Sequence, residues 1–300
     1  MPELATASGS RPAPARVLVV VAHPDDVDFG AAGTVAALTA LGSEVTYCLV
    51  TSGEAGSDHL PIEGHELSAR REAEQTDAAA AVGVDELMFL HHPDGALEPT
   101  IAVRRDITAA IRRARPDVVI CQSPDRMLDR IFASHPDHLA AGEATLCAVY
   151  PDARNPRAYP ELLDQDLAPH TVREVWLMAH TGPDLFVDVT DTVEHKLAAL
   201  RAHRSQTEHR DDLEPMIRGW LTMTAEAGGP ARGAARGGVQ GRAHRLIPAM
   251  GHEDDALPAS VRRSWTGGRR GRGPRPARRR GGSSRCGRGT GPSGRRRRRR

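Results

Sequence analysis

The sequence has very little lysine, few aromatic residues and no long apolar run. Lysine occurs once, at Lys196, and aromatic residues make up 3% of the 300 residues. The abundance of Ala, Gly and Pro beside arginine indicates a GC-rich gene, so the arginine count carries little functional information. No apolar run reaches the length of a membrane-spanning helix, and the N-terminus lacks the features of a signal peptide. The sequence therefore predicts a cytoplasmic protein without a membrane partner.

Cysteine is also scarce. The four cysteines show no CxxC spacing (Cys48, Cys121, Cys147 and Cys286). Nothing in this spacing suggests a disulfide framework, and we expect Cys48 and Cys121 to be buried free thiols because they lie in apolar runs. A glycine-rich dinucleotide fingerprint should follow the first strand, and Gly53 and Gly56 come later, so the sequence excludes a nicotinamide cofactor.

The formal net charge of +1 averages two unlike regions. Residues 261–300 hold 17 arginines and no acidic residue, which leaves 23 basic and 39 acidic residues in residues 1–260, a net charge of −16. An acidic body argues against nucleic-acid binding by the folded domain. The Arg-rich end has three possible interpretations. It is an arm that binds nucleic acid or another anionic surface, a disordered and solvated tail, or a sequence translated from a shifted reading frame.

The most informative stretch is an apolar run, Val17–Val21, that stops at His23-Pro24-Asp25-Asp26. A short apolar run rich in β-branched residues indicates a buried central strand of a parallel sheet. Polar residues just beyond such a strand lie where open α/β sheets bind ligands. The His-Pro-Asp segment can also be only a turn, in which Pro ends the strand and Asp caps the next helix.

A second cluster weakens the interpretation that the first His-Pro-Asp segment is only a turn. Ser134-His135-Pro136-Asp137-His138 repeats the His-Pro-Asp arrangement more than a hundred residues later, again after a strand-like run. Alternating apolar strands and helices predict an α/β fold with a Rossmann-like, mostly parallel sheet and helices on both faces. We expect strands at about 16–22, 44–51, 86–90, 117–121, 172–179 and 185–189, and helices at about 30–41, 66–82, 100–114, 137–149 and 190–203.

Three regions are expected along the chain. Residues 1–15 are rich in Ala, Pro and Ser and are predicted to be disordered. Residues 16–225 form the folded domain, and residues 226–300 form a low-complexity, Gly/Arg/Pro-rich disordered tail.

The two histidine clusters predict a catalytic zinc site. Three protein ligands and one open position are typical of catalytic zinc. His23 and Asp26 can point into one pocket from the turn after the strand, and either His138 or His135 can supply the third ligand. Asp25 is then free to act as general base, and the other histidine can stabilise an oxyanion or protonate a leaving amine.

These residues resemble a known family. Ala22-His23-Pro24-Asp25-Asp26 paired with the 134–138 cluster is similar to the LmbE-like, or PIG-L, zinc-dependent N-deacetylases. The similarity extends to Arg71 with Glu74, to Pro93-Asp94-Gly95, and to the late segments 188–191, 196–200 and 203–206. It covers about residues 16–225. Many family members have Glu directly after the two aspartates, where this chain has Val27 followed by Asp28.

The resemblance implies a Rossmann-like fold and removal of an N-acetyl group from a GlcNAc-type glycoconjugate. It assigns zinc to His23, Asp26 and His138, and the general-base role to Asp25. It implies that His135 assists the oxyanion or leaving group, that Asp137 orients a neighbouring histidine, and that Arg71 and Asp94 contact sugar hydroxyls. Some relatives have a tyrosine just before the second cluster, whereas this chain has Phe132 and Ala133 there.

The substrate class is therefore expected to be a small amino-sugar conjugate. A mycothiol S-conjugate amidase-like hydrolase is an alternative within the same chemistry. Nucleic-acid or anionic-surface binding through the Arg-rich tail is the alternative from another class, and an inactive relative or damaged gene is a third. The sequence leaves the oligomeric state open, a homo-oligomer included.

Overall fold

The structure is a computed structural model that describes residues 2–56, 62–228 and 238–245. The chain divides into two units, Met1–Ala249 and Met250–Arg300, and the second lies outside the described residues. All the described helices and strands belong to the first unit. Among the described residues, no helix combines the length and the apolar character that crossing a bilayer requires.

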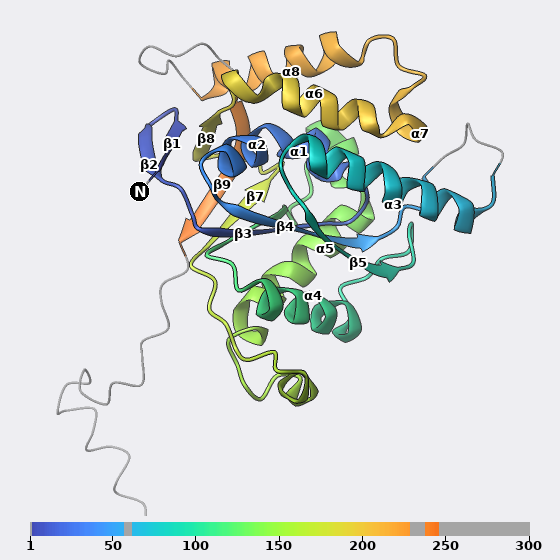
Figure 1. The fold of residues 1–300 in the computed structure, drawn as a ribbon, viewed down its shortest axis with the longest axis vertical. Coiled ribbons are helices and arrows are strands. Elements are labelled where there is room, and N and C mark those ends of the chain that lie inside the picture. Colours follow the sequence, from blue (N-terminus) through green and yellow to red (C-terminus); the bar gives the residue numbers. More distant parts are fainter. Residues whose placement is uncertain (1, 57–61, 229–237, 246–300) are drawn as a thin grey trace, which may run out of the picture. The chain divides into compact units, whose positions relative to one another are not determined.

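A nine-stranded sheet forms the centre of the first unit (Figure 1), in the order β2-β1-β8-β9-β7-β6-β3-β4-β5. The five strands from β7 to β5 are parallel, and the others pair antiparallel. The strands are β1 (Glu3–Thr6), β2 (Gly9–Pro12), β3 (Arg16–Val21), β4 (Glu44–Thr51), β5 (Glu86–His92), β6 (Val118–Gln122), β7 (Glu174–Met178), β8 (Leu185–Asp188) and β9 (Gly238–Arg245).

Strand β3 is buried on both faces because helices cover the two sides of the sheet. Val20 of β3 pairs with Cys48 of β4 and with Cys121 of β6, and all three are fully buried. Parallel strands covered on both faces have continuous apolar sequences, which is the pattern that predicted this strand. The prediction of a mostly parallel α/β sheet is confirmed.

Two helical layers enclose the sheet (Figure 1). Alternate β3 residues, including Val19, pack with α2, α3, α6 and α8 in one core, whereas Leu18 and Val20 pack with α4 and α5 in the other. The α-helices are α1 (Asp26–Gly30), α2 (Ala32–Ala40), α3 (Gly64–Ala81), α4 (Ile101–Ala114), α5 (Pro136–Cys147), α6 (Val193–Ala202), α7 (Arg204–Thr207) and α8 (Leu213–Ala227). Shorter turns are η1 (Leu128–Ser134), η2 (Ala148–Asp152), η3 (Pro160–Gln165) and η4 (Thr190–Thr192).

The N-terminal residues differ from the prediction of a disordered segment over 1–15. They form the β1–β2 hairpin, in which Gly9, the first residue of β2, has a φ of 127°. β1 also pairs with β8, and Leu4 is only 1% exposed in the core. A hairpin at a sheet edge gains backbone hydrogen bonds whatever its polarity, so the Pro- and Ser-rich composition misled the prediction.

The C-terminal boundary also differs from the prediction. Helix α8 continues to Ala227, and β9 at Gly238–Arg245 lies between β7 and β8. β9 and the last two residues of α8, Glu226 and Ala227, fall within the segment 226–300 that the sequence predicted to be a disordered tail. The prediction depended on apolar periodicity, and a strand paired on both sides through its backbone needs none. Residues 229–237 and 246–300 of the predicted tail lie outside the described residues.

Candidate active site at the carboxyl end of the parallel strands

Apart from Arg71 on α3, the sequence-predicted residues lie in three segments that follow strands of the parallel sheet. The segment His23–Asp26 follows β3, Asp94 follows β5, and the segment His135–His138 lies at the start of α5, after β6. The chain leaves β3 toward β4 on one side and later returns to β6 on the other, so β3 and β6 flank the switch point of the sheet. Ligand sites of open α/β sheets lie at this point.

Asp26 connects the two histidine clusters. One carboxylate oxygen, Oδ2, lies 3.2 Å from Nδ1 of His23, and the other, Oδ1, lies 2.9 Å from Nε2 of His138. The rings of His23 and His138 have centroids 5.2 Å apart. Two imidazole nitrogens and a carboxylate thus converge on one point, although more than a hundred residues separate Asp26 from His138 in the sequence.

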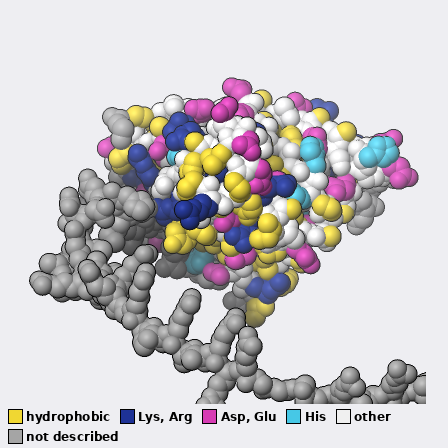
Figure 2. Space-filling view, turned by 90° about the horizontal axis from the view of Figure 1, so that it is seen from below, with side chains coloured by type: hydrophobic (Ala, Val, Ile, Leu, Met, Phe, Trp, Pro, Cys, Tyr) yellow, Lys and Arg dark blue, Asp and Glu magenta, His cyan; other side chains and the backbone are white. Residues whose placement is uncertain are grey.

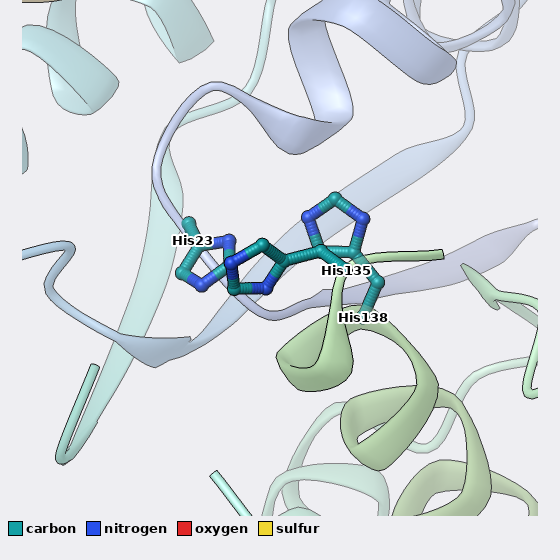
Figure 3. Close-up of side chains that lie close together, drawn as sticks. All are labelled: His23, His135 and His138. Atoms are coloured by element: carbon teal, nitrogen blue, oxygen red, sulfur yellow. The ribbon is translucent and has the colours of Figure 1, made fainter. Parts of the chain in front are cut away.

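His135 also faces this group (Figure 3). Its ring centroid is 5.1 Å from that of His23 and 5.2 Å from that of His138, and ligand nitrogens of the three rings lie within 4.8 Å of one another. However, Nδ1 of His135 accepts a hydrogen bond of 3.2 Å from the Asp137 backbone N–H and caps α5. This contact leaves Nε2 of His135 as the nitrogen that can face a ligand.

The far side of His23 is held by carboxylates. Nε2 of His23 lies 3.0 Å from Asp94 and 3.3 Å from Asp137. Asp137 is 1% exposed and also accepts a 2.7 Å hydrogen bond from the Gly95 N–H. Carboxylates accept but do not donate, so in a neutral, metal-bound His23 the Nε2–H would donate to Asp94 and Asp137 and the Nδ1 lone pair would be left for the ion. Nδ1 therefore faces Asp26, in the arrangement by which carboxylates orient metal-ligating histidines.

Negative charge dominates the site. Burial acts to lower the pKa of His23, but the carboxylates of Asp26, Asp137 and Asp94 raise it to about 12. Burial acts to raise the pKa of Asp94, but contacts led by the hydrogen bond from His23 lower it to about 2. Burial raises the pKa of Asp25 to about 6. So many carboxylates around two imidazoles favour a bound cation, and the donor set fits a divalent metal ion.

Arg71 is buried and contacts Asp25. Its side chain on α3 is 4% exposed, and Nη2 donates to the Pro24 carbonyl (2.6 Å) and to Oδ2 of Asp25 (3.1 Å). Nη1 donates to the Gly53 carbonyl at 2.9 Å. The structure thus places Arg71 against Asp25, and contact with a sugar hydroxyl stays a prediction. Asp94 lies against His23 as described above, and its predicted sugar contact likewise stays a prediction.

A buried group of polar residues behind Asp25 was not predicted from the sequence. Gln75, Asp28 and His203 are all 0% exposed and are hydrogen-bonded to one another through Asp28. No local pattern marks Gln75, because it lies in the middle of α3. The signals in the sequence were Asp28, one position beyond the Glu of many family members, and the late segment 203–206, which contains His203.

Comparison with known proteins places the chain among sugar deacetylases. The family model described as PIG-L, GlcNAc-PI de-N-acetylase, matches residues 18–149. The diacetylchitobiose deacetylase of Thermococcus kodakarensis is 37% identical over 191 residues, which cover 64% of this chain and 70% of that protein. The probable N-acetyl-alpha-D-glucosaminyl L-malate deacetylase 2 of Bacillus cereus is 34% identical over 203 residues, which cover 64% of this chain and 84% of that protein.

A solved structure of a deacetylase is also similar to this chain. The N,N'-diacetylchitobiose deacetylase from Pyrococcus horikoshii, in complex with its inhibitor MPG, superposes with a TM-score of 0.70 and 31% sequence identity. The match covers 79% of this chain and 88% of that chain.

Proposed function

The chain belongs to the PIG-L (LmbE-like) family of deacetylases, and on this premise we propose that it is a metal-dependent hydrolase that removes an N-acetyl group from a GlcNAc-type glycoconjugate. The observation that carries the proposal is Asp26, whose carboxylate contacts Nδ1 of His23 and Nε2 of His138. The proposal includes a small amino-sugar conjugate as substrate and a cytoplasmic location.

Deacetylases of this family are metal-dependent, and we propose zinc for this site. His23, Asp26 and His138 would hold the ion, since two imidazoles and one carboxylate are a donor set that catalytic zinc prefers. When bound, zinc supplies a Lewis acid that polarises a carbonyl and makes water acidic enough to ionise near neutral pH. His23 presents Nδ1 to the ion because Asp94 and Asp137 occupy Nε2.

Asp25 is the proposed general base. Of the two neighbouring carboxylates, that of Asp26 contacts two histidines. Among the described contacts, the carboxylate of Asp25 contacts Arg71 instead. The carboxylate would accept a proton from the attacking water and pass it to the leaving amine. Burial raises the pKa of Asp25 to about 6, which brings its proton affinity closer to that of a base working near neutral pH.

His135 is the proposed donor to the oxyanion. The Asp137 N–H donates to Nδ1 of His135, so the proton of the neutral ring lies on Nε2. Burial, together with nearby His23 and His138, lowers the pKa of His135, which keeps the ring neutral at pH 7. Nε2–H can then donate a hydrogen bond to the carbonyl oxygen as negative charge develops on it. Phe132 and Ala133 stand before the cluster, where some relatives have a tyrosine, and neither residue offers a hydroxyl for this task.

The proposed function predicts chelator-sensitive acetate release. Incubation with N,N'-diacetylchitobiose should release acetate and a free amine, detected by enzymatic acetate assay and by mass spectrometry. Dialysis against a chelator should reduce the rate at least about 100-fold, and added zinc should restore it, because Asp25 alone does not ionise water efficiently. Chelator saturated with zinc beforehand is the control. Equal rates in chelated and untreated protein would contradict a metal-dependent reaction.

The nucleic-acid alternative is not favoured. Basic and acidic side chains are interspersed on the face of the first unit that Figure 2 shows, in keeping with the net charge of −16 for residues 1–260. The Arg-rich residues 261–300 lie outside the described residues. A mycothiol S-conjugate amidase-like activity would use the same residues and is distinguished by the substrate assayed.

A further inference from the structure

Asp25 is held in an uncommon backbone conformation. Its φ is 88° and its ψ is −25°, in the left-handed region, immediately before α1 begins at Asp26. A residue with a side chain rarely adopts a positive φ, and such conformations persist where the surrounding structure enforces them. The contacts that enforce the left-handed conformation of Asp25 therefore also set the direction of its carboxylate.

Two side chains of α3 hold the Asp25 segment. Oε1 of Gln75 accepts a 2.9 Å hydrogen bond from the Asp25 N–H, and Arg71 donates to Oδ2 of Asp25 and to the Pro24 carbonyl. Arg71 and Gln75 are four residues apart and therefore lie on the same face of the helix. The exposed fractions of Arg71 and Gln75 are 3% and 0%, so both of these side chains are shielded from water.

The Gln75 amide has only one productive orientation. Its NH₂ donates to Oδ2 of Asp28 at 2.9 Å, while its carbonyl oxygen faces the Asp25 N–H. A carboxylate accepts hydrogen bonds only, so Asp28 fixes the NH₂ on its own side. The reversed amide would place NH₂ against the Asp25 N–H and oxygen against the Asp28 carboxylate, and both contacts would be repulsive.

Asp28 is itself fixed by the last part of the domain. Nε2 of His203 lies 2.7 Å from Oδ2 of Asp28, and both side chains are 0% exposed. Nζ of Lys196 on α6 donates to the carbonyl of Asp28 at 2.5 Å. Glu74 accepts hydrogen bonds from the N–H (2.9 Å) and the hydroxyl (2.5 Å) of Ser205, which joins α3 to the segment that carries His203.

We propose that Gln75 is a positioning residue that sets the geometry of the general base Asp25, and that Asp28, held by His203, fixes the orientation of the Gln75 amide. The inference rests on the proposed function. It assigns a role to the buried Asp28, and it links Gln75 and His203 to the carboxylate of Asp25. Gln75 is fully buried and its hydrogen bonds go to the Asp25 N–H and to Asp28, so its effect would reach the reaction through Asp25.

A swap of amide and carboxylate tests the orientation. In Gln75→Glu, two carboxylates face each other at the 2.9 Å contact and no donor remains between them. In the double variant Gln75→Glu with Asp28→Asn, the new amide at position 28 can donate to the new carboxylate at position 75. The other oxygen of that carboxylate still accepts from the Asp25 N–H.

The double variant keeps the number of carboxylates and amides in this buried group unchanged. It has the same net charge as the wild type, because one carboxylate and one amide are exchanged. To accept the second amide proton through Nε2, the ring of His203 must carry its own proton on Nδ1, which has no hydrogen-bond partner among the described residues. The recovery is therefore expected to be partial. Recovery in this variant therefore reports the orientation of the amide rather than a change in total charge.

The expected result is a loss and a recovery of kcat at constant KM. Gln75→Glu should lower kcat on N,N'-diacetylchitobiose by about 10²-fold, since small displacements of a catalytic group have effects of this size. The double variant should recover at least about 10-fold of that loss. Metal content and KM should stay within twofold of wild type in every variant, because the metal-binding residues are not altered.

Two further variants separate positioning from general stability. Gln75→Met removes the acceptor for the Asp25 N–H without adding charge, so it should lower kcat, and Asp28→Asn should not rescue it. Gln165→Glu makes the same change at an exposed residue of η3 and should leave kcat unaltered. Thermal unfolding identifies any variant whose loss of kcat merely follows loss of folded protein.

Two outcomes overturn the inference alone: folded Gln75→Glu and Gln75→Met proteins whose kcat stays within twofold of wild type, or a folded double variant no faster than Gln75→Glu. A wild-type protein that releases no acetate overturns the proposed function, and with it the role of Asp25 that Gln75 would serve.

Discussion

Replacing Asp25 with asparagine is expected to lower kcat by about 10²- to 10⁴-fold while the protein keeps its fold and its metal. Asparagine has the shape of aspartate and can still accept the hydrogen bond that Arg71 donates to Oδ2. It has no proton affinity near neutral pH, so it cannot take a proton from water. The loss therefore isolates proton transfer from positioning.

The measurement is steady-state kinetics of acetate release, together with metal content by plasma emission. Asp164→Asn is the matched control, because Asp164 is an exposed residue of η3. It should have wild-type kinetics. An Asp25→Asn protein that carries metal and keeps kcat within about 10-fold of wild type would fall outside the range of general-base catalysis and would remove Asp25 from the mechanism.

The second large effect is expected from the two histidines of the 135–138 cluster, which should separate metal binding from catalysis. His138→Ala should weaken zinc binding at least about 100-fold, more than loss of a residue that only orients a ligand, and should abolish activity. His135→Ala should keep zinc binding and lose kcat by about 10²- to 10³-fold, as removal of an oxyanion donor does. The reason is geometric: Nε2 of His138 contacts Asp26, whereas Nδ1 of His135 accepts from the Asp137 N–H.

Zinc affinity is measured by competition with a coloured chelator, and kcat is measured with zinc in excess. His170→Ala is a suitable control because the His170 ring contacts the Pro116 carbonyl instead. If His135→Ala loses zinc and His138→Ala retains it, the assignment of the two histidines is reversed.

The sequence predicted those features that local patterns encode. The apolar run before His23 identified β3, because a strand covered on both faces needs apolar residues throughout. The repeated His-Pro-Asp segments identified the two sides of the site, because parallel strands end at the same edge of a sheet. The family resemblance is confirmed by the comparisons.

Features that depend on tertiary contacts were not predictable. The hairpin at Glu3–Pro12 and the strand at Gly238–Arg245 depend on backbone pairing, which leaves no apolar pattern in the sequence. Gln75 and Arg71 contact Asp25 from α3, 50 and 46 residues further along the chain. Nothing in the spacing within that helix shows which face will lie against the β3 turn.

The most direct test of the proposed metal site is the position of the ion in crystals of the zinc-loaded protein, located by anomalous diffraction at the zinc absorption edge. We expect one peak bonded to Nδ1 of His23, a carboxylate oxygen of Asp26 and Nε2 of His138, each at about 2.0–2.2 Å. A peak bonded to His135 in place of His138, or zinc-loaded crystals with no peak between His23 and Asp26, would contradict it.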